Sequence, residues 1–227
     1  MSEISSTKVH LFHGFFLTSL ILILTICLEI LCLDDVNKLL KKKGGQDLYK
    51  KAIIANFFNV WMFGSLTYWF NVSYLCHPGL TLVQQVRGSI GVIFVEGLLY
   101  YLLHRAFHEV TGFYWAHSFH HRFNDVILPS TASAVCMTEF SMAYMSPIII
   151  SCAIIPNDRA SAVVGVVTIS VTNLLIHTPF MVATTHKKKL RWFLVDADDH
   201  FRHHRKLTTN YAAPVISFDR IFGSDSK

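Results

Sequence analysis

Five long apolar runs constrain this 227-residue chain more than any other feature of its sequence. They cover residues 11–33, 52–76, 88–103, 134–155 and 160–185. A helix needs about 20 mainly apolar residues to cross the hydrocarbon layer of a bilayer, and several of the runs approach or exceed that length. The backbone of a spanning segment must satisfy its own hydrogen bonds, which favours helices. We therefore predict an all-α integral membrane bundle of about four to five transmembrane helices.

The composition agrees with a membrane location. Hydrophobic residues make up 52% of the chain and charged residues only 15%, whereas soluble domains carry roughly 25% charged residues. We find no internal repeat and no linker, so residues 1–227 are expected to form a single membrane domain. The first apolar run is too long for a cleaved signal peptide and is expected to be a signal anchor. So apolar a chain is not expected to bind nucleic acid.

The basic residues are unevenly distributed. Of the twenty Lys and Arg residues, six lie within residues 38–51 and nine within residues 187–227, while Arg105 and Arg122 flank the first histidine motifs. Cytosolic loops of membrane proteins are enriched in Lys and Arg. These segments are therefore predicted to face the cytosol, with residues 104–125 and 186–227 forming a helical cytosolic cap that binds metal.

Histidines are the second distinctive feature. Eight of the thirteen fall into three clusters with the spacings HxxxH, HxxHH and HxxHH: His104 and His108; His117, His120 and His121; His200, His203 and His204. On a helix, residues three and four apart share a face, so each cluster can converge. A four-coordinate zinc cannot use eight imidazoles, so two metal ions are predicted.

A ninth histidine lies near the end of the fifth apolar run. His177 is a further candidate ligand because an ionisable residue at membrane depth is commonly functional, although it could instead hydrogen-bond a neighbouring helix. Metal-bound imidazoles usually donate their second N–H to a carboxylate or carbonyl. Four acidic residues are candidates for this supporting role: Glu96, Glu139, Asp198 and Asp199.

The ligand set narrows the chemistry. All-imidazole ligation suits zinc, copper, iron or nickel, and nine ligands shared by two ions give four or five each. A hydrolytic zinc keeps three protein ligands and one open position, so nine are too many for one such ion. Two redox-active irons at a membrane face could activate O₂ against a C–H bond of a lipid.

The three histidine motifs are followed by a motif of another kind near the C-terminus. They read HRAFH at 104–108, HSFHH at 117–121 and HFRHH at 200–204, and the tail carries NY at 210–211 and FDRIFG at 218–223. In this order they resemble the fatty acid hydroxylase / sterol desaturase superfamily of integral-membrane enzymes. The resemblance covers roughly residues 96–223. Phe218 stands where that family usually has tryptophan.

The resemblance implies a cytosolic cap with a dinuclear non-heme iron centre in the endoplasmic reticulum membrane. It also implies O₂-dependent hydroxylation, desaturation or methyl oxidation of a sterol, fatty acyl or sphingoid lipid. Electrons would come from NAD(P)H through a reductase, possibly via cytochrome b5. The expected partners are thus the lipid bilayer, a hydrophobic substrate and a redox protein.

The resemblance further implies a division of the ligands. One iron would take His104, His117, His120, His200 and His203, and the other would take His108, His121, His177 and His204. Some members carry a second histidine four residues from the one that matches His177. Here those positions are Asn173 and Met181, so Asn173 or water is expected in place of a fifth ligand to the second iron.

Two other classes of function are compatible with parts of the pattern. An enzyme of the same fold could catalyse a non-redox isomerisation or cyclisation. A divalent-metal-binding or transport protein would also need clustered ligands, but a transporter should place them near the bilayer midplane. Here the clusters lie at or beyond the ends of the apolar runs, which favours the membrane oxygenase.

Overall fold

The computed structural model describes residues 2–188, 190 and 192–226. Within them the chain forms helices joined by loops, with a single isolated β-bridge between Leu194 and Ile216. The elements are α1 (Ser2–Leu31), α2 (Leu33–Leu40), α3 (Gly45–Phe57), η1 (Phe58–Gly64), α4 (Ser65–Tyr74), α5 (Leu82–Glu109), α6 (Tyr114–His117), η2 (His120–Arg122), η3 (Pro129–Thr131), α7 (Met137–Glu139), η4 (Phe140–Met145), α8 (Ser146–Ile154), α9 (Arg159–Ile176), α10 (Pro179–Lys187), α11 (Ala197–Lys206) and α12 (Phe218–Phe222).

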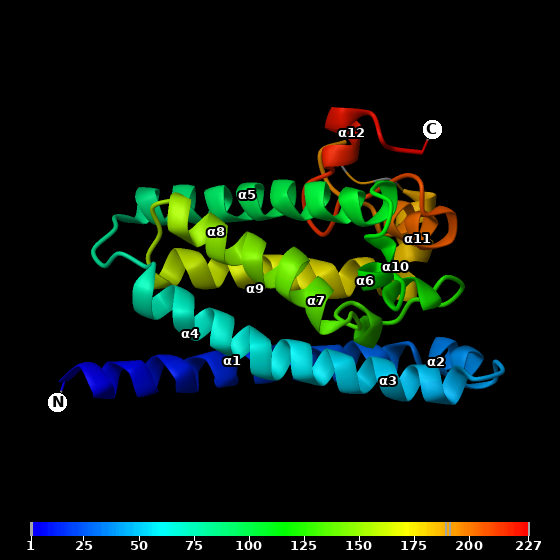
Figure 1. The fold of residues 1–227 in the computed structure, drawn as a ribbon, viewed down its shortest axis with the longest axis horizontal. Helices are drawn as coiled ribbons and strands as arrows, with labels where there is room; N and C mark the ends of the chain where they lie inside the picture. Colours follow the sequence, from blue (N-terminus) through cyan, green and yellow to red (C-terminus); the bar gives the residue numbers. More distant parts are fainter. Residues whose placement is uncertain (1, 189, 191, 227) are drawn as a thin grey trace.

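The long helices run roughly along one axis and form a bundle (Figure 1). α1 packs against α4, and α5 packs against α8 and α9. Four stretches are long and apolar enough to cross a membrane: Thr7–Leu31, Leu82–Glu109, Met137–Ile154 and Arg159–Ile176. The predicted all-α membrane bundle is confirmed. The apolar run 52–76 forms most of the continuous α3–η1–α4 stretch beside α1, but it is not among the four stretches that meet this hydropathy criterion.

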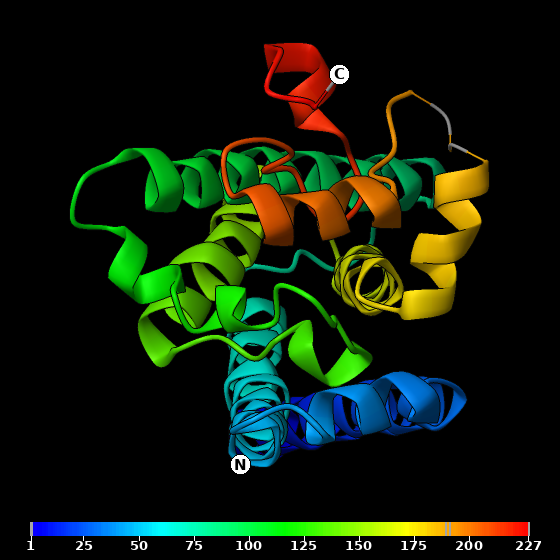
Figure 2. The same ribbon diagram turned by 90° about the vertical axis from the view of Figure 1, so that its right-hand side faces the viewer.

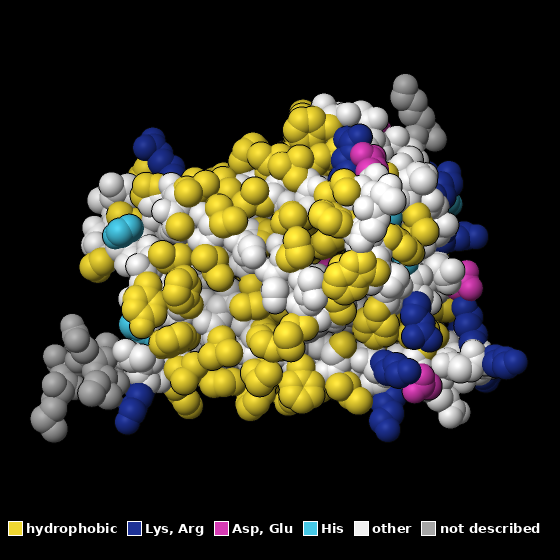
Figure 3. Space-filling model, in the orientation of Figure 1, with side chains coloured by type: hydrophobic (Ala, Val, Ile, Leu, Met, Phe, Trp, Pro, Cys, Tyr) yellow, Lys and Arg dark blue, Asp and Glu magenta, His cyan; other side chains and the backbone are white. Residues whose placement is uncertain are grey.

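The surface of the bundle matches a lipid environment. Large apolar side chains of α1 such as Phe12, Ile23 and Ile26 are exposed, and apolar side chains cover the middle of the face shown in Figure 3. Exposed apolar area this extensive is unfavourable in water and marks contact with lipid or protein. On that face the Lys and Arg side chains gather at the ends, most of them at the end where α2, α3 and α11 lie.

The fifth apolar run is not one helix, contrary to the expectation for residues 160–185. α9 ends at Ile176 and α10 begins at Pro179, with Thr178 in an extended conformation at φ −99° and ψ 119°. A proline disfavours helical geometry in the residue before it, so Pro179 accounts for the break. α10 consequently turns away from the axis of α9 (Figure 2), and His177 lies at the corner between them.

The fourth run also begins later than the predicted residue 134. Its helix starts at Met137, and Cys136 before it is extended. The preceding segment is held by buried polar side chains of the other helices. Glu29 of α1 accepts hydrogen bonds from the N–H and hydroxyl of Ser130 at 3.0 and 2.9 Å, and the Asn59 amide donates to the carbonyl of Ser133 at 2.9 Å. This segment closes the histidine end of the bundle.

Candidate metal centre

The nine candidate histidines converge at one end of the bundle in two groups. Within each group the nearest nitrogen atoms lie within 4.8 Å of one another. The first group contains His104, His108, His117, His121 and His203, and the second contains His120, His177, His200 and His204. All nine rings are buried except His108, which is half-buried. Segments far apart in the sequence therefore meet at two neighbouring points.

This grouping corrects the division of ligands implied by the resemblance. That division separated His104 from His108 and His117 from His121, but each of these pairs shares the first group. The reason is helical geometry, because residues four apart project from nearly the same side whereas adjacent residues differ by about 100°. Each HxxHH motif therefore splits, and its two adjacent histidines face different groups.

The two groups are direct neighbours. The ring centroids of His121 and His204 are 5.0 Å apart, and those of His117 and His120 are 5.3 Å apart. One of each pair belongs to each group. Ions held by the two groups would therefore lie side by side rather than in separate sites.

Backbone carbonyls fix the orientation of three of these rings. His104 Nδ1 donates to the Tyr211 carbonyl at 2.6 Å, His203 Nδ1 to that of Thr209 at 2.8 Å, and His177 Nδ1 to that of Asn173 at 2.8 Å. A carbonyl oxygen only accepts, so Nδ1 of each ring carries the proton. In the neutral ring Nε2 then presents a lone pair, which is the form that binds a metal.

The inward-facing nitrogens fit cations. His104 Nε2 lies 2.8 Å from His117 Nε2, and His177 Nε2 lies 3.0 Å from His200 Nε2. Burial lowers the pKa of His177 to about 4 and that of His203 to about 3, so these rings are neutral at physiological pH. Crowded lone pairs in a buried site are unfavourable unless a positive charge lies between them. The donor set thus suits two metal ions with nitrogen ligands.

The comparisons with known proteins agree with this geometry. The family model described as fatty acid hydroxylase matches residues 89–224, which are 136 of the 227 residues and include all nine histidines. The chain belongs to the fatty acid hydroxylase family. No curated protein and no solved structure matches the chain.

One of the four acidic residues predicted to support a histidine does so in this member of the fatty acid hydroxylase family. Glu139 Oε1 lies 2.6 Å from His117 Nδ1, and both side chains are buried. A carboxylate in this position orients the ring and raises the basicity of its other nitrogen. Glu139 lies in the first turn of the apolar stretch Met137–Ile154, so a helical stretch long enough to cross a membrane also positions His117.

The other supporting candidates have different roles. Asp198 accepts hydrogen bonds from Arg202 and His186, and Asp199 pairs with Arg220. These carboxylates lie on the side of α11 that meets α10 and α12. Asn173 acts through its backbone carbonyl on His177, while its side-chain amide donates to the carbonyl of Ala132.

Glu96 does not contact a histidine as predicted for a supporting residue. It lies eight residues before His104 on α5, roughly 12 Å along the helix axis, and has no hydrogen bond to a histidine in the described part of the chain. Its carboxyl group lines a cavity between the helices instead. Glu96, Tyr100, His104 and His108 do form a stripe at four-residue spacing on α5, but Glu96 lies at the end of the stripe that is remote from the histidine groups.

The C-terminal motif of the family has a structural explanation that sequence reasoning did not supply. Asp219 accepts hydrogen bonds from the backbone N–H groups of Tyr211 and Ala212 at 2.8 and 2.6 Å. It thereby holds the Tyr211 carbonyl, which accepts from His104. The eight-residue spacing between Tyr211 and Asp219 in the NY and FD motifs was the available signal. Phe218 fits against Gly97 of α5, where a Cβ would lie 3.2 Å from its ring.

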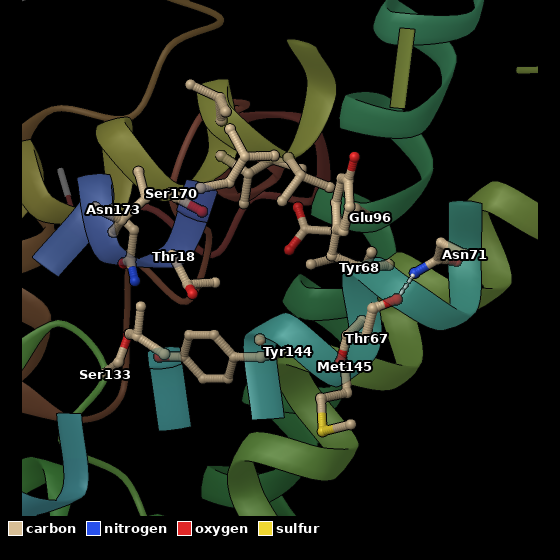
Figure 4. A pocket seen from close by; sticks show the side chains of 18 of the residues that line it. Thr18, Thr67, Tyr68, Asn71, Glu96, Ser133, Tyr144, Met145, Ser170 and Asn173 are labelled. Atoms are coloured by element: carbon tan, nitrogen blue, oxygen red, sulfur yellow. Dashed lines mark hydrogen bonds between the residues drawn. The ribbon is translucent and has the colours of Figure 1, made fainter. Parts of the chain in front are cut away.

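An apolar cavity lies among the helices. Its walls come from α1, η1, α4, α5, η4, α8 and α9 (Figure 4). Two of its lining residues touch the metal centre. The Tyr100 ring packs against His104 with centroids 5.2 Å apart, and Asn173 carries the carbonyl bound to His177. One residue of the cavity wall therefore contacts a histidine of each group.

Proposed function

We propose that this chain is an O₂-dependent membrane lipid oxidoreductase, acting as a hydroxylase, desaturase or methyl oxidase through a non-heme di-iron centre. The observation that carries the proposal is the convergence of nine histidines in two neighbouring groups, beside an apolar cavity whose wall residues Tyr100 and Asn173 contact His104 and His177. Family membership supports lipid oxidation. The substrate would be a sterol, a fatty acyl group or another hydrophobic biosynthetic intermediate.

Different residues of the chain would bind the metal ions, orient the histidine rings and exclude water. The five and four histidines of the two groups would hold one iron each, and bound iron would supply the activation of O₂. The carbonyls of Tyr211, Thr209 and Asn173, together with Glu139, keep four of the rings turned inward. The buried surroundings exclude water from the reacting carbon, which protects an oxidising centre from side reactions.

The cavity would position the substrate. Its lining consists mainly of aliphatic and aromatic side chains such as Ile21, Phe140, Val166 and Leu174. An apolar chain can pass from the bilayer into such a cavity without exposing apolar surface to water. Tyr100 and Tyr144 stand in the cavity wall with ring centroids 5.6 Å apart, and Tyr100 would limit how far a substrate chain approaches His104.

The electron supply is part of the proposal. We propose NAD(P)H as the source, through a reductase and possibly cytochrome b5, with the histidine end facing the cytosol from the endoplasmic reticulum membrane. Basic side chains near that end, such as Lys41, Lys43 and Lys50, are exposed and would steer an acidic redox partner by long-range attraction. The concentration of Lys and Arg at the histidine end also supports a cytosolic orientation of that end, because cytosolic segments of membrane proteins are enriched in these residues.

The test uses purified protein in nanodiscs, loaded with ferrous iron under anaerobic conditions. We expect about two irons per chain, one for each histidine group, and O₂ uptake that depends on added lipid extract and reductant. His120→Ala and His203→Ala, one from each group, should abolish turnover, while His10→Ala at the other end of the bundle should not change it. Full turnover in the two ligand variants would overturn the assignment, and product formed without O₂ and reductant would favour isomerase or cyclase chemistry.

A further inference from the structure

A buried carboxyl group lies in the cavity away from the histidines. Glu96 occupies the middle of α5 and is 2% exposed, and its side chain points into the cavity (Figure 4). Its Oε2 atom is fully enclosed and has no hydrogen-bond partner in the described part of the chain. A buried acceptor without a partner is costly, because it loses its hydration and gains nothing in return. An ionisable residue at this depth in a membrane helix is therefore expected to have a function.

Glu96 Oε2 receives no hydrogen bond from the cavity wall. No Lys, Arg or His is among the described residues that line the cavity. Two hydroxyl groups of the cavity wall donate to backbone carbonyls instead, since Thr67 bonds the carbonyl of Phe63 and Tyr144 that of Ala132. Asn71, also in the wall, presents a second buried acceptor, because its Oδ1 has no partner among the described residues. Two buried oxygen atoms of the wall, Glu96 Oε2 and Asn71 Oδ1, thus lack a partner among the described residues, and a donor carried by a ligand would satisfy one of them.

We propose that Glu96 binds a hydroxyl group of the lipid that occupies the cavity. A neutral hydroxyl can donate to the carboxyl group and enters an apolar cavity at little cost. An ammonium group would bring a charge into the apolar cavity and would have to lose its hydration, which makes it the poorer match. The inference names a substrate class for the oxidoreductase proposed above and so rests on that function. The class is a hydroxylated lipid.

The position of Glu96 separates the anchored hydroxyl from the reacting carbon. Glu96 precedes His104 by eight residues on one straight helix, which corresponds to roughly 12 Å along its axis. A lipid held at Glu96 would therefore present a carbon several bonds away from its hydroxyl to the histidines. Glu96 is in this view a specificity-determining residue, and it takes no part in the chemistry at the metal centre.

Equilibrium binding with a matched pair of probes tests the proposal. The full-length protein in detergent is titrated with tritiated 1-hexadecanol, and unlabelled hexadecyl methyl ether and hexadecylamine compete with it. The alcohol and the ether share the same chain, but only the alcohol donates a hydrogen bond. We expect the alcohol to bind about tenfold more tightly than the ether, as one hydrogen bond to a buried carboxyl group allows, and the amine to bind more weakly than the alcohol.

The variants isolate Glu96. In Glu96→Met the alcohol-to-ether ratio should fall to about one without loss of ether binding, since the methionine keeps the volume and removes the acceptor. Glu96→Gln should keep a reduced preference, because the amide oxygen still accepts. Thr67→Val is the matched control, as its hydroxyl lines the same cavity but bonds its own helix, and it should keep the wild-type ratio.

The outcomes are decisive in both directions. Equal binding of alcohol and ether by the wild type, or a preserved preference in Glu96→Met, would overturn the proposal. Tighter binding of the amine would overturn the choice of a hydroxyl. If Glu96→Met does not fold, the wild-type ratio and the Glu96→Gln ratio still decide the matter. The assay needs neither O₂ nor reductant, so an absence of iron or of O₂ uptake would sink the proposed oxidoreductase while leaving the alcohol preference intact.

Discussion

The two histidine groups draw on the same motifs, but they differ in how many of their rings are held by hydrogen bonds. In the five-histidine group, His104, His117 and His203 each have Nδ1 bonded to a carbonyl or carboxylate. In the four-histidine group, His177 is held in this way, whereas Nδ1 of His200 and His204 has no hydrogen-bond partner in the described part of the chain. Both groups are buried, so the difference lies in their support.

The comparison indicates how the two ions would be held. Rings that the protein already holds lose little freedom when a metal binds, and a bonded Nδ1 makes the opposite nitrogen a better ligand. The five-histidine group therefore resembles a preformed site. The four-histidine group depends more on the ion itself for its order, and it has one ligand fewer. We expect the second group to be the weaker of the two sites.

The largest expected effect comes from removing one ligand from each group. His204→Ala leaves three histidines in the weaker group, and we expect that site to lose more than about a hundredfold in affinity, beyond the loss typical of a supporting residue. The iron content should fall from about two to about one per chain. His108→Ala removes the half-buried ligand of the other group and leaves four, so it should retain both ions. Metal analysis after dialysis at low free iron measures both.

Chelation of the wild type provides the corresponding check. A graded series of chelator concentrations should remove the two ions in two steps, and the step at lower chelator should be absent in His204→Ala. Release of both ions in a single step, or retention of two ions by His204→Ala, would show that the two groups bind equally well. The difference in ring support would then have no consequence for affinity.

A smaller effect is expected for Glu139→Gln. Loss of the carboxylate beside His117 should weaken the five-histidine site by about ten- to a hundredfold, in line with other residues that support a metal ligand. The four-histidine site should be unchanged, which narrows the gap between the two chelation steps. Asp198→Asn serves as the control, because Asp198 bonds Arg202 and His186 rather than one of the nine histidines. An equal loss in both variants would contradict a specific role for Glu139.

The sequence predicts much of this arrangement because its strongest signals are local. The apolar runs determine the helical bundle. The spacing of the three motifs identifies eight histidines and the position in an apolar run identifies His177, and the structure does bring these nine together. The division between the groups was wrong because it depends on the rotation of each helical turn. Adjacent histidines such as His120 and His121 look equivalent in a motif but project in different directions.

The supporting contacts were harder to predict for another reason. Three of the four rings with a bonded Nδ1 use backbone carbonyls, at Thr209, Tyr211 and Asn173. A carbonyl exists at every residue, so no side-chain pattern marks the ones that face a histidine. Glu96 shows the converse, because it is spaced from His104 by a multiple of four residues yet lies too far along α5 to reach the histidine groups. The break at Pro179 was visible in the sequence but was outweighed by the apolar composition around it.

The smallest expected effect concerns a residue one step further from the metal. Asp219 accepts from two N–H groups and so fixes the Tyr211 carbonyl that orients His104. Asp219→Asn keeps only one oxygen acceptor, leaving one buried N–H unpaired at a cost of about 1–3 kcal/mol in the free energy of unfolding. The five-histidine site should weaken by less than Glu139→Gln weakens it, since the carbonyl is displaced rather than removed. Asp125→Asn, which breaks only an exposed ion pair with Lys42, is the control for denaturant titration and metal release. If Asp219→Asn weakened the four-histidine site and left the affinity of the five-histidine site unchanged, the C-terminal motif would support the opposite site, and the contrast between the two groups would have to be reversed.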